Sequence, residues 1–386
     1  MGKINLLFII AKLELGGAQK QLLSLISHLD KSKYNIYLFT AKNGLLMKDA
    51  LSLGDTRVIP SKFLERPVNL LNDFLAFIEV CFFIKNNNID ILHTHGSKAG
   101  ILGRFAGKCT GVKALLHTVH GWSFNDYQPF FLRLLFIWFE KLCARFSDRI
   151  IVVCEHDKKE GLNKRIGSNS QYCVIHYGIN HLEFQGKDIN LKGELGIDNH
   201  DLVVGMVACF KPQKSPLDFI EVARRVSRIV PESRFLLIGD GVLRKKIEAQ
   251  IVKLGLSKRV ILTGWRNDIP RIIFSMDVFV LTSLWEGVPI SVLEAMAASK
   301  PVVVTNTGGI EEVISDEVNG YLVSIKDTTR LSEKIIVLLG NEELREQTGQ
   351  NARRSLDGRF RVENMARDTS VLYEVILNSK GACKYA

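Results

Sequence analysis

Two glutamates, Glu286 and Glu294, have seven residues between them in a run that follows an apolar segment. Pro289 lies between them. Because proline is favoured at the start of a helix, we expect Glu286 on a loop and Glu294 about one turn into a helix. The backbone N–H groups of Gly287 and Val288 would then face an anion at the positive end of that helix. The carboxylate of Glu294 can accept hydrogen bonds from vicinal hydroxyls, such as those of a ribose. Two carboxylates repel a bare phosphate, so the pattern indicates a ligand with hydroxyl groups as well as phosphate, as in a nucleotide sugar.

Two lysines, Lys211 and Lys214, follow an expected strand at 202–208 and precede a helical segment. Lysine ammonium groups at such a position can neutralise a diphosphate. A solvated loop with incidental lysines is the alternative interpretation. The sequence Gly239-Asp240-Gly241, after the next strand, is by itself more typical of a sharp turn than of a binding site.

A glycine pair, Gly16 and Gly17, follows the first apolar run and precedes a helical segment. Gly17 would let a ligand approach bare N–H groups at a helix start, where the helix dipole favours anions. Close packing of helix and strand explains the same pair. The pattern is not G-x-G-x-x-G, so a dinucleotide site is not supported.

Histidines cluster at the ends of two neighbouring expected strands, in His93-Thr94-His95-Gly96 and in His117-Thr118-Val119-His120-Gly121. We expect His93 and His117 to be hydrogen-bonded core residues, because they lie within or beside strands. His120 precedes a glycine at a loop start and is expected to face a ligand. No acidic or cysteine ligand has suitable spacing beside these histidines, so no metal site is predicted.

Short apolar runs alternate with segments of helical spacing along the whole chain, which is typical of βαβ units with a parallel sheet. We expect strands at 3–10, 35–40, 56–59, 89–93, 114–118, 149–153, 172–176, 202–208, 234–238, 260–263, 278–282, 301–305 and 320–323. The fold expected is α/β, with two Rossmann-like, doubly wound parallel-sheet domains facing a central cleft. Residues 1–184 would form the first domain and 185–361 the second, with a polar linker at 185–201. Residues 362–386 would form a helix that returns towards the first domain.

The formal net charge of +10 favours an anionic partner. The basic residues are spread along the chain without a long run, so nucleic acid is not predicted as the partner. Seven scattered cysteines without a C-x-x-C motif fit a reducing compartment. Charged residues interrupt the most apolar segments, so no membrane-spanning helix is expected.

These motifs resemble those of the family 4 glycosyltransferases. The string E-G-V-P-I-S-V-L-E-A-M-A holds both glutamates, G-D-G precedes it, and G-G-I-E-E and N-G follow it. The resemblance covers nearly the whole chain, through G-G-A-Q near the start, H-T-V-H-G before the middle and V-I-H-Y-G-I-N at the domain join. It implies the GT-B fold and a retaining enzyme that uses a nucleotide-diphospho-sugar without a metal or other cofactor.

The resemblance also implies roles for single residues. Glu286 would contact the hydroxyls of the donor sugar, Glu294 the ribose and Lys214 the diphosphate. His120 would line the reacting sugar, and Gly17 would approach the phosphate or the acceptor.

Two further positions concern the base and the diphosphate. Arg266 stands where such enzymes hold the base. The family usually has an arginine on the diphosphate, where this chain has Cys209. A thiol cannot replace that charge, and Lys211 is the candidate substitute.

The implied reaction transfers a hexose or N-acetylhexosamine, from a donor expected to be UDP-linked, to an undecaprenyl-diphosphate-linked glycan in bacterial surface-polysaccharide assembly. The implied location is the cytoplasmic face of the inner membrane. A nucleotide-sugar 2-epimerase of the same fold and a transferase with a small soluble acceptor remain open as alternatives. A non-catalytic polyanion-binding protein is disfavoured, because two carboxylates would weaken anion binding. The sequence leaves the sugar, the base, the linkage and the oligomeric state open.

The segment 122–149 combines many aromatic residues with a few basic ones. On a helix, one narrow polar stripe would form, and most of the remaining surface would be apolar; the stripe would consist of Arg133, Glu140, Lys141, Ala144 and Arg145. The segment is predicted to dock reversibly on an anionic membrane beside the acceptor entrance. The alternative is a core helix with its polar stripe in water.

Overall fold

The computed structural model describes residues 2–186 and 191–382, and the chain forms two compact units. Unit 1 consists of Met1–Gly178 and Arg359–Ala386, and unit 2 is Ile179–Gly358. The chain therefore leaves unit 1, completes unit 2 and comes back to unit 1. The boundaries lie at 178 and 358, where the sequence suggested 184 and 361. The proposed linker at 185–201 includes residues 187–190, which lie outside the described residues, and α7 (Leu191–Glu194).

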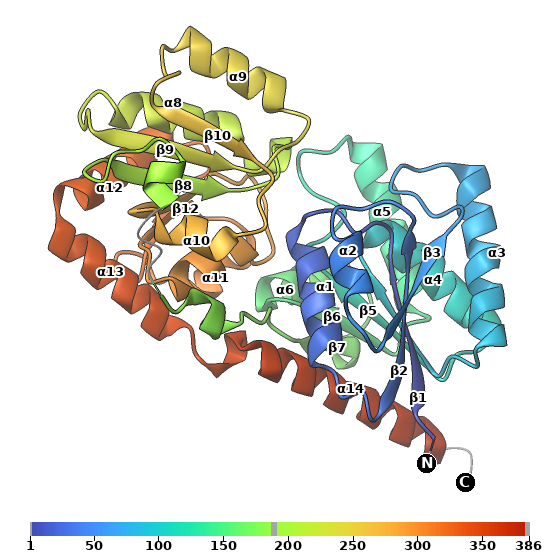
Figure 1. The fold of residues 1–386 in the computed structure, drawn as a ribbon. Helices are drawn as coiled ribbons and strands as arrows, with labels where there is room; N and C mark the ends of the chain where they lie inside the picture. Colours follow the sequence, from blue (N-terminus) through green and yellow to red (C-terminus); the bar gives the residue numbers. More distant parts are fainter. Residues whose placement is uncertain (1, 187–190, 383–386) are drawn as a thin grey trace. The chain divides into compact units, whose positions relative to one another are not determined.

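Unit 1 is built on a seven-stranded, all-parallel sheet with the order β3-β2-β1-β4-β5-β6-β7 (Figure 1). The central strands are almost wholly buried because helices cover both faces, which is why they are continuous apolar runs. The strands are β1 (Ile4–Ile10), β2 (Tyr34–Ala41), β3 (Thr56–Ser61), β4 (Ile91–His95), β5 (Ala114–Val119), β6 (Arg149–Val152) and β7 (Tyr172–Val174).

Three apolar cores lie among the described residues of unit 1. One joins the sheet to α1 and α14, which are far apart in the chain, through residues such as Leu22 and Met365. Another joins it to the consecutive helices α3 and α4, and the third includes Ile137 of α5. The helices of unit 1 are α1 (Gly17–His28), α2 (Met47–Leu51), α3 (Leu70–Asn86), α4 (Ser97–Thr110), α5 (Phe130–Ala144), α6 (Glu155–Asn163) and α14 (Val362–Ala382).

Unit 2 repeats the architecture with six parallel strands in the order β10-β9-β8-β11-β12-β13. Its strands are β8 (Leu202–Val207), β9 (Ser233–Ile238), β10 (Val260–Gly264), β11 (Val278–Leu281), β12 (Val302–Thr305) and β13 (Tyr321–Val323). Its remaining helices are α8 (Pro216–Val226), α9 (Arg244–Lys253), α10 (Ile269–Phe274), α11 (Ile290–Ala297), α12 (Thr328–Gly340) and α13 (Glu342–Ser355). Helix α8 packs against α9 and α12, while α11 packs against α10 and α13.

The strand order reverses once in each unit, between β1 and β4 in unit 1 and between β8 and β11 in unit 2. In open α/β sheets, ligands bind beyond the carboxyl ends of the strands at such a switch point, because the loops diverge there and leave a crevice. The loops that follow these four strands are therefore where functional side chains are expected. Each expected strand is present, with ends within two residues of those expected, and the α/β fold with two parallel sheets is confirmed.

Candidate functional site

In unit 2, the loops after β8 and β11 bring Lys214 and Glu286 into direct contact. The ammonium group of Lys214 forms an ion pair with Oε1 of Glu286, and the hydroxyl of Ser283 donates to the same oxygen at 2.5 Å. Only 8% of the Glu286 side chain and 16% of the Lys214 side chain are exposed. The two candidate residues therefore form one polar cluster at the switch point of this sheet.

Hydrogen bonds between the two loops hold this cluster in place. The hydroxyl of Thr282 donates to the carbonyl oxygens of Lys214 and Ser215, at 3.0 and 2.9 Å. The backbone N–H of Leu284 donates to the carbonyl of Gln213 at 2.7 Å, and the side-chain amide of Gln213 donates to the carbonyl of Trp285 at 2.8 Å. Each loop thus fixes the backbone of the other, so the ion pair forms on a rigid base.

A third loop, after β12, supports Glu286 from its backbone side. A Cβ atom on Gly308 would lie 1.9 Å from the carbonyl oxygen of Glu286, so only glycine fits at this position. Gly308 also has a φ of +62°, which favours glycine. The N–H of Gly309 donates to the carbonyl of Gly287 at 2.9 Å. The glycine-rich turn after β12 therefore positions the Glu286 loop.

Helix α11 begins one residue later than expected, because Pro289 has an extended conformation and precedes the first helical residue, Ile290. Gly287 and Val288 are buried just before this helix start, and Glu294 is half-buried within the helix. The order of Glu286, a helix N-terminus and Glu294 is thus as the sequence indicated.

Arg266 lies after β10 and is not a free cation. Its guanidinium group binds Asp268 in a bidentate manner, with Nε to Oδ1 at 2.8 Å and Nη2 to Oδ2 at 2.5 Å. These hydrogen bonds lower the pKa of Asp268 and raise that of Arg266. A base held here would meet a guanidinium group that a carboxylate has already oriented.

Lys211 and Cys209 lie on the loop after β8, which packs closely on Gly239 and Gly241. A Cβ on Gly239 would lie 2.0 Å from the carbonyl oxygen of Ala208, and one on Gly241 would lie 2.7 Å from that of Phe210. The N–H of Phe210 donates to the carbonyl of Asp240 at 2.8 Å. The G-D-G sequence therefore serves backbone packing, in agreement with its interpretation as a sharp turn.

In unit 1, Gly17 is the exposed first residue of α1, at the loop after β1. The histidines lie on the neighbouring strands β4 and β5 or just beyond them. His93 is fully buried, with Nδ1 2.6 Å from the hydroxyl of Tyr373 and Nε2 2.7 Å from that of Thr118. His117 Nδ1 is 2.9 Å from the hydroxyl of Thr94. The expectation that His93 and His117 are hydrogen-bonded core residues is confirmed.

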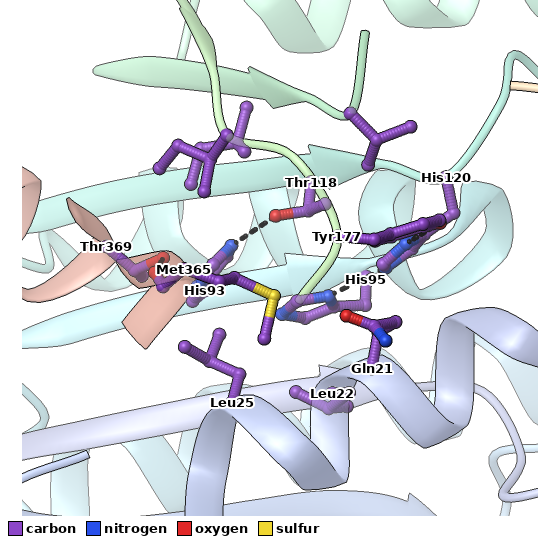
Figure 2. A pocket seen from close by; sticks show the side chains of 13 residues that line it. Gln21, Leu22, Leu25, His93, His95, Thr118, His120, Tyr177, Met365 and Thr369 are labelled. Carbon is purple, nitrogen blue, oxygen red and sulfur yellow. Dashed lines mark hydrogen bonds between the residues drawn. The ribbon is translucent and has the colours of Figure 1, made fainter. Parts of the chain in front are cut away.

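His120 is half-buried and uses both ring nitrogens within unit 1 (Figure 2). Nδ1 lies 2.8 Å from the hydroxyl of Tyr177, and Nε2 lies 2.9 Å from Nδ1 of His95. Burial lowers the pKa of His120 to about 4 and, with the neighbouring histidines, lowers that of His95 well below its ordinary value. Both rings are therefore neutral at physiological pH.

The described residues, 2–186 and 191–382, contain neither a metal-binding cluster nor a membrane-spanning helix. No group of three or more histidine, cysteine, aspartate or glutamate side chains in these ranges is arranged to hold a metal ion. None of the helices in the same ranges combines the length and apolar character needed to cross a bilayer.

Similarity to known proteins shows the family to which this chain belongs. Residues 15–181 match the family described as "Glycosyltransferase Family 4", and residues 188–355 match "Glycosyl transferases group 1". A galactosyltransferase of Escherichia coli, named for UDP-Gal and α-D-GlcNAc-diphosphoundecaprenol, is 34% identical over 321 residues. The match covers 81% of this chain and 82% of that protein. The chain therefore belongs to the same glycosyltransferase family as this E. coli enzyme.

Other glycosyltransferases support the same placement. A Campylobacter jejuni α-1,3-N-acetylgalactosaminyltransferase, named for a diphospho-undecaprenol acceptor, is 30% identical over 74% of this chain and 76% of its own. The structure of Anabaena HepE with UDP-glucose superposes with a TM-score of 0.85 at 21% identity, over 96% of this chain and all of that one. The lipopolysaccharide glycosyltransferase WaaG gives a TM-score of 0.76 at 16% identity, over 94% of this chain and 99% of its own. The fold is thus that of GT-B glycosyltransferases.

Sequence reasoning missed four polar residues of this glycosyltransferase that contact the candidates. Ser283 and Gln213 bind the Glu286 loop, while His95 and Tyr177 bind His120. Ser283 precedes Glu286 by three residues, and His95 belongs to the H-T-H-G cluster, so both had a local signal. Gln213 and Tyr177 are 73 and 57 residues from their partners, and only the fold brings them close.

Proposed function

We propose that this glycosyltransferase moves a hexose or N-acetylhexosamine, with retention of configuration, from a UDP-sugar to a glycan on undecaprenyl diphosphate. The observation that carries the proposal is the Lys214–Glu286 cluster at the switch point of unit 2. It combines a cation for the diphosphate with a carboxylate for sugar hydroxyls. The similarity to the E. coli enzyme supports both the donor and the acceptor class.

In the proposed step, the bond between the anomeric carbon and the diphosphate oxygen breaks, and the acceptor oxygen bonds to the same face of that carbon. The acceptor hydroxyl proton passes to the departing diphosphate, so no enzyme nucleophile or redox partner is required. Charge grows on the diphosphate as the bond breaks. Lys214 and the N-terminus of α11, near Gly287 and Val288, would stabilise it.

Before this step can occur, the Lys214–Glu286 ion pair has to change its partners. Lys214 must give up part of its bond to Glu286 to reach a diphosphate, and Glu286 then gains oxygen lone pairs for sugar hydroxyls. Glu294 would bind the ribose, Arg266 would border the base, and Lys211 would contribute charge where Cys209 supplies none. The chemistry is proposed to need no metal ion.

The acceptor end of the reaction is proposed to lie at an anionic membrane, because unit 1 exposes apolar side chains on two helices. On α5, Phe130 and Phe131 are 66% and 84% exposed, and Trp138 is 56% exposed. On α3, Leu70 and Phe74 are 84% and 59% exposed. Both helices contact α4 and begin beyond the carboxyl ends of strands. Exposed aromatic and aliphatic side chains on two helices that each pack against α4 suit the lipid interface, and a net charge of +10 adds attraction to anionic lipid.

The transfer experiment uses purified full-length chain, a panel of UDP-sugars and a synthetic GlcNAc-diphosphate-lipid acceptor, with products identified by mass spectrometry and NMR. We expect one α-linked product from a UDP-hexose or UDP-N-acetylhexosamine. Turnover should persist in excess EDTA. A β-linked product would overturn retention, and loss of turnover that manganese or magnesium restores would overturn the metal-independent phosphate site.

The epimerase and soluble-acceptor alternatives are tested in the same assay. Donor incubated without acceptor should show no 2-epimer by NMR. Transfer to water-soluble GlcNAc phosphate as fast as to the lipid-linked acceptor would contradict the lipid-linked assignment.

A further inference from the structure

The ring of His120 is held from both sides by neutral partners. The hydroxyl of Tyr177 lies 2.8 Å from Nδ1, and Nδ1 of His95 lies 2.9 Å from Nε2. The rings are also nearly parallel, at 27° for His95 and 21° for Tyr177. A substrate hydroxyl can therefore reach a His120 nitrogen only by replacing one of these two partners.

His95 is the less replaceable partner. It is the last residue of β4, at the switch point of the unit 1 sheet, and its side chain is only 2% exposed. Its ring lies between those of His93 and His120, at centroid distances of 4.3 and 5.2 Å (Figure 2). Tyr177 is also buried, at 7% exposed, but it lies on the loop after β7, just before the chain passes into unit 2.

His95 also contains a polar atom that the fold leaves unsatisfied. Its Nε2 is buried and has no hydrogen-bond partner among the described residues. The residue lines a small cavity together with His93, His120, Tyr177 and apolar side chains from α1 and α14. An unpaired buried polar atom destabilises the fold, so a function that needs the other nitrogen of His95 would account for its retention.

Two proton arrangements satisfy these contacts. In the first, the Tyr177 hydroxyl donates to His120 Nδ1, and His120 Nε2–H donates to His95 Nδ1. In the second, His95 Nδ1–H donates to His120 Nε2, and His120 Nδ1–H donates to the Tyr177 oxygen. In each arrangement, the direction of the His95–His120 bond and the nitrogen of His120 that carries the proton are set together.

We propose that His95 is a positioning residue that fixes the tautomer and orientation of His120. A substrate hydroxyl would then bind Nδ1 of His120 by replacing the hydroxyl of Tyr177. This inference rests on the proposed function, in which His120 lines the reacting sugar. Burial lowers the pKa of both histidines and favours their neutral forms. The hydrogen-bonded row of His95, His120 and Tyr177, called the relay below, therefore sets which atoms donate and which accept, without carrying a net charge.

Two substitutions of His95 separate positioning from packing. His95→Leu fills much of the same space but removes the bond to His120. His95→Asn places an amide near the position of Nδ1 and keeps a hydrogen-bonding group for His120. Both variants bury one altered side chain at the same site, so a purely structural role would affect both through their melting temperatures.

The first readout is ring ¹⁵N NMR of protein labelled on histidine, with the His120 signals assigned by their loss in His120→Gln. We expect one neutral tautomer of His120 between pH 6 and 8 in the wild type and in His95→Asn, and a mixture of tautomers in His95→Leu. Identical His120 signals in wild type and His95→Leu would overturn the proposal. This readout needs no turnover, so it decides the relay even if the proposed transfer reaction is wrong.

The second readout is transfer kinetics with the donor and acceptor that the transfer experiment of the proposed function identifies. His95→Leu should lower kcat at least tenfold without changing the Kd for UDP, because UDP is assigned to unit 2, and His95→Asn should restore most of the loss. Equal losses of kcat in His95→Leu and His95→Asn would contradict the assignment.

Discussion

At the scale of single residues, the ion pair couples Lys214, which is expected to bind the diphosphate, to Glu286, which is expected to bind the sugar hydroxyls. Each side chain neutralises the other in a nearly buried site, and burying either charge alone would cost several kcal/mol. In the proposed donor complex, a diphosphate that takes up Lys214 would leave Glu286 in need of new partners, which the sugar hydroxyls could provide. Binding and orientation of the sugar would then be linked.

Glu286→Gln should lower kcat at least about 100-fold, because an amide accepts weaker hydrogen bonds than a carboxylate and leaves Lys214 unpaired. The measurement is turnover with the verified donor, together with the melting temperature of each variant. Glu317→Gln is the matched control, because Glu317 is an exposed carboxylate of unit 2 paired only at the surface with Lys334. Near-wild-type turnover of Glu286→Gln would contradict its role.

Glu294→Ala should weaken the binding of free UDP roughly 10- to 150-fold, since a carboxylate that accepts hydrogen bonds from two ribose hydroxyls is worth about 1.5–3 kcal/mol. Isothermal titration calorimetry with UDP measures this directly. The control is Glu343→Ala, an exposed position on α13. Unchanged affinity in Glu294→Ala would reject the ribose contact.

The sequence indicated the candidate residues but not their partners. Glu286 and Glu294 could be found because both lie in one short string around a helix start. The ion pair could not, because Lys214 is 72 residues away and the pairing depends on how the loops after β8 and β11 meet. Likewise, His120 had a local signal in H-T-V-H-G, while its partner Tyr177 depends on the fold of unit 1.

At the scale of elements, α5 buries a different set of side chains from the set that the core-helix alternative predicted. Glu140 was expected on a polar stripe in water, but it is 2% exposed and its carboxylate accepts from Nη2 of Arg104 on α4 at 2.7 Å. Hydrophobic periodicity could not reveal this, because the buried partner lies on another helix. Ile137 and Cys143 of α5 are buried, whereas Phe130 and Phe131 are exposed, so the core-helix alternative is wrong for these two phenylalanines.

Replacing Phe130 and Phe131 together with serine should remove most co-sedimentation with anionic vesicles at low salt and leave the melting temperature unchanged, since both side chains are largely exposed. Activity on a lipid-linked acceptor should fall, while UDP binding persists. Ile229→Ser, at an exposed apolar residue of unit 2, is the control. Failure of the wild type to bind such vesicles would end the membrane assignment.

At the scale of the whole molecule, the strands were the most predictable part. A strand buried on both faces must be a short continuous apolar run, and the runs 202–208 and 278–282 became β8 and β11 almost unchanged. The division into units was less accurate, because the residues that follow β7, up to Gly178, pack with unit 1 although a polar stretch follows them. Composition locates a polar linker, but packing decides where a unit ends.

Unit 1 should lose stability as the pH falls from about 6.5 to about 4. Burial lowers the pKa of His93 to about 3 and that of His120 to about 4, and it lowers those of His95 and His117 well below 6.5. The unfolded chain therefore binds more protons in this range, and the stabilisation present above pH 6.5 is lost as the pH falls. Each such histidine contributes up to about 1.4 kcal/mol per pH unit.

Denaturant unfolding followed between pH 4 and 8 measures this loss, with tryptophan fluorescence of Trp122 and Trp138 reporting on unit 1. The variant His93→Gln should flatten the pH dependence, while His200→Gln, at a largely exposed histidine of unit 2, should leave it unchanged. A stability that stays constant across this range would contradict the buried neutral histidines.

The return of α14 to unit 1 has a consequence for how the protein is made. The hydroxyl of Tyr373 on α14 is the partner of His93 Nδ1, and α14 completes the core that contains Leu22 and Leu25. The ribosome synthesises all of unit 2 before α14. Unit 2 can therefore finish folding before unit 1 does. Most of unit 1 is synthesised first, but it still lacks the helix that closes one of its cores. A premature stop codon after residue 358 would thus damage the unit encoded at the opposite end of the message.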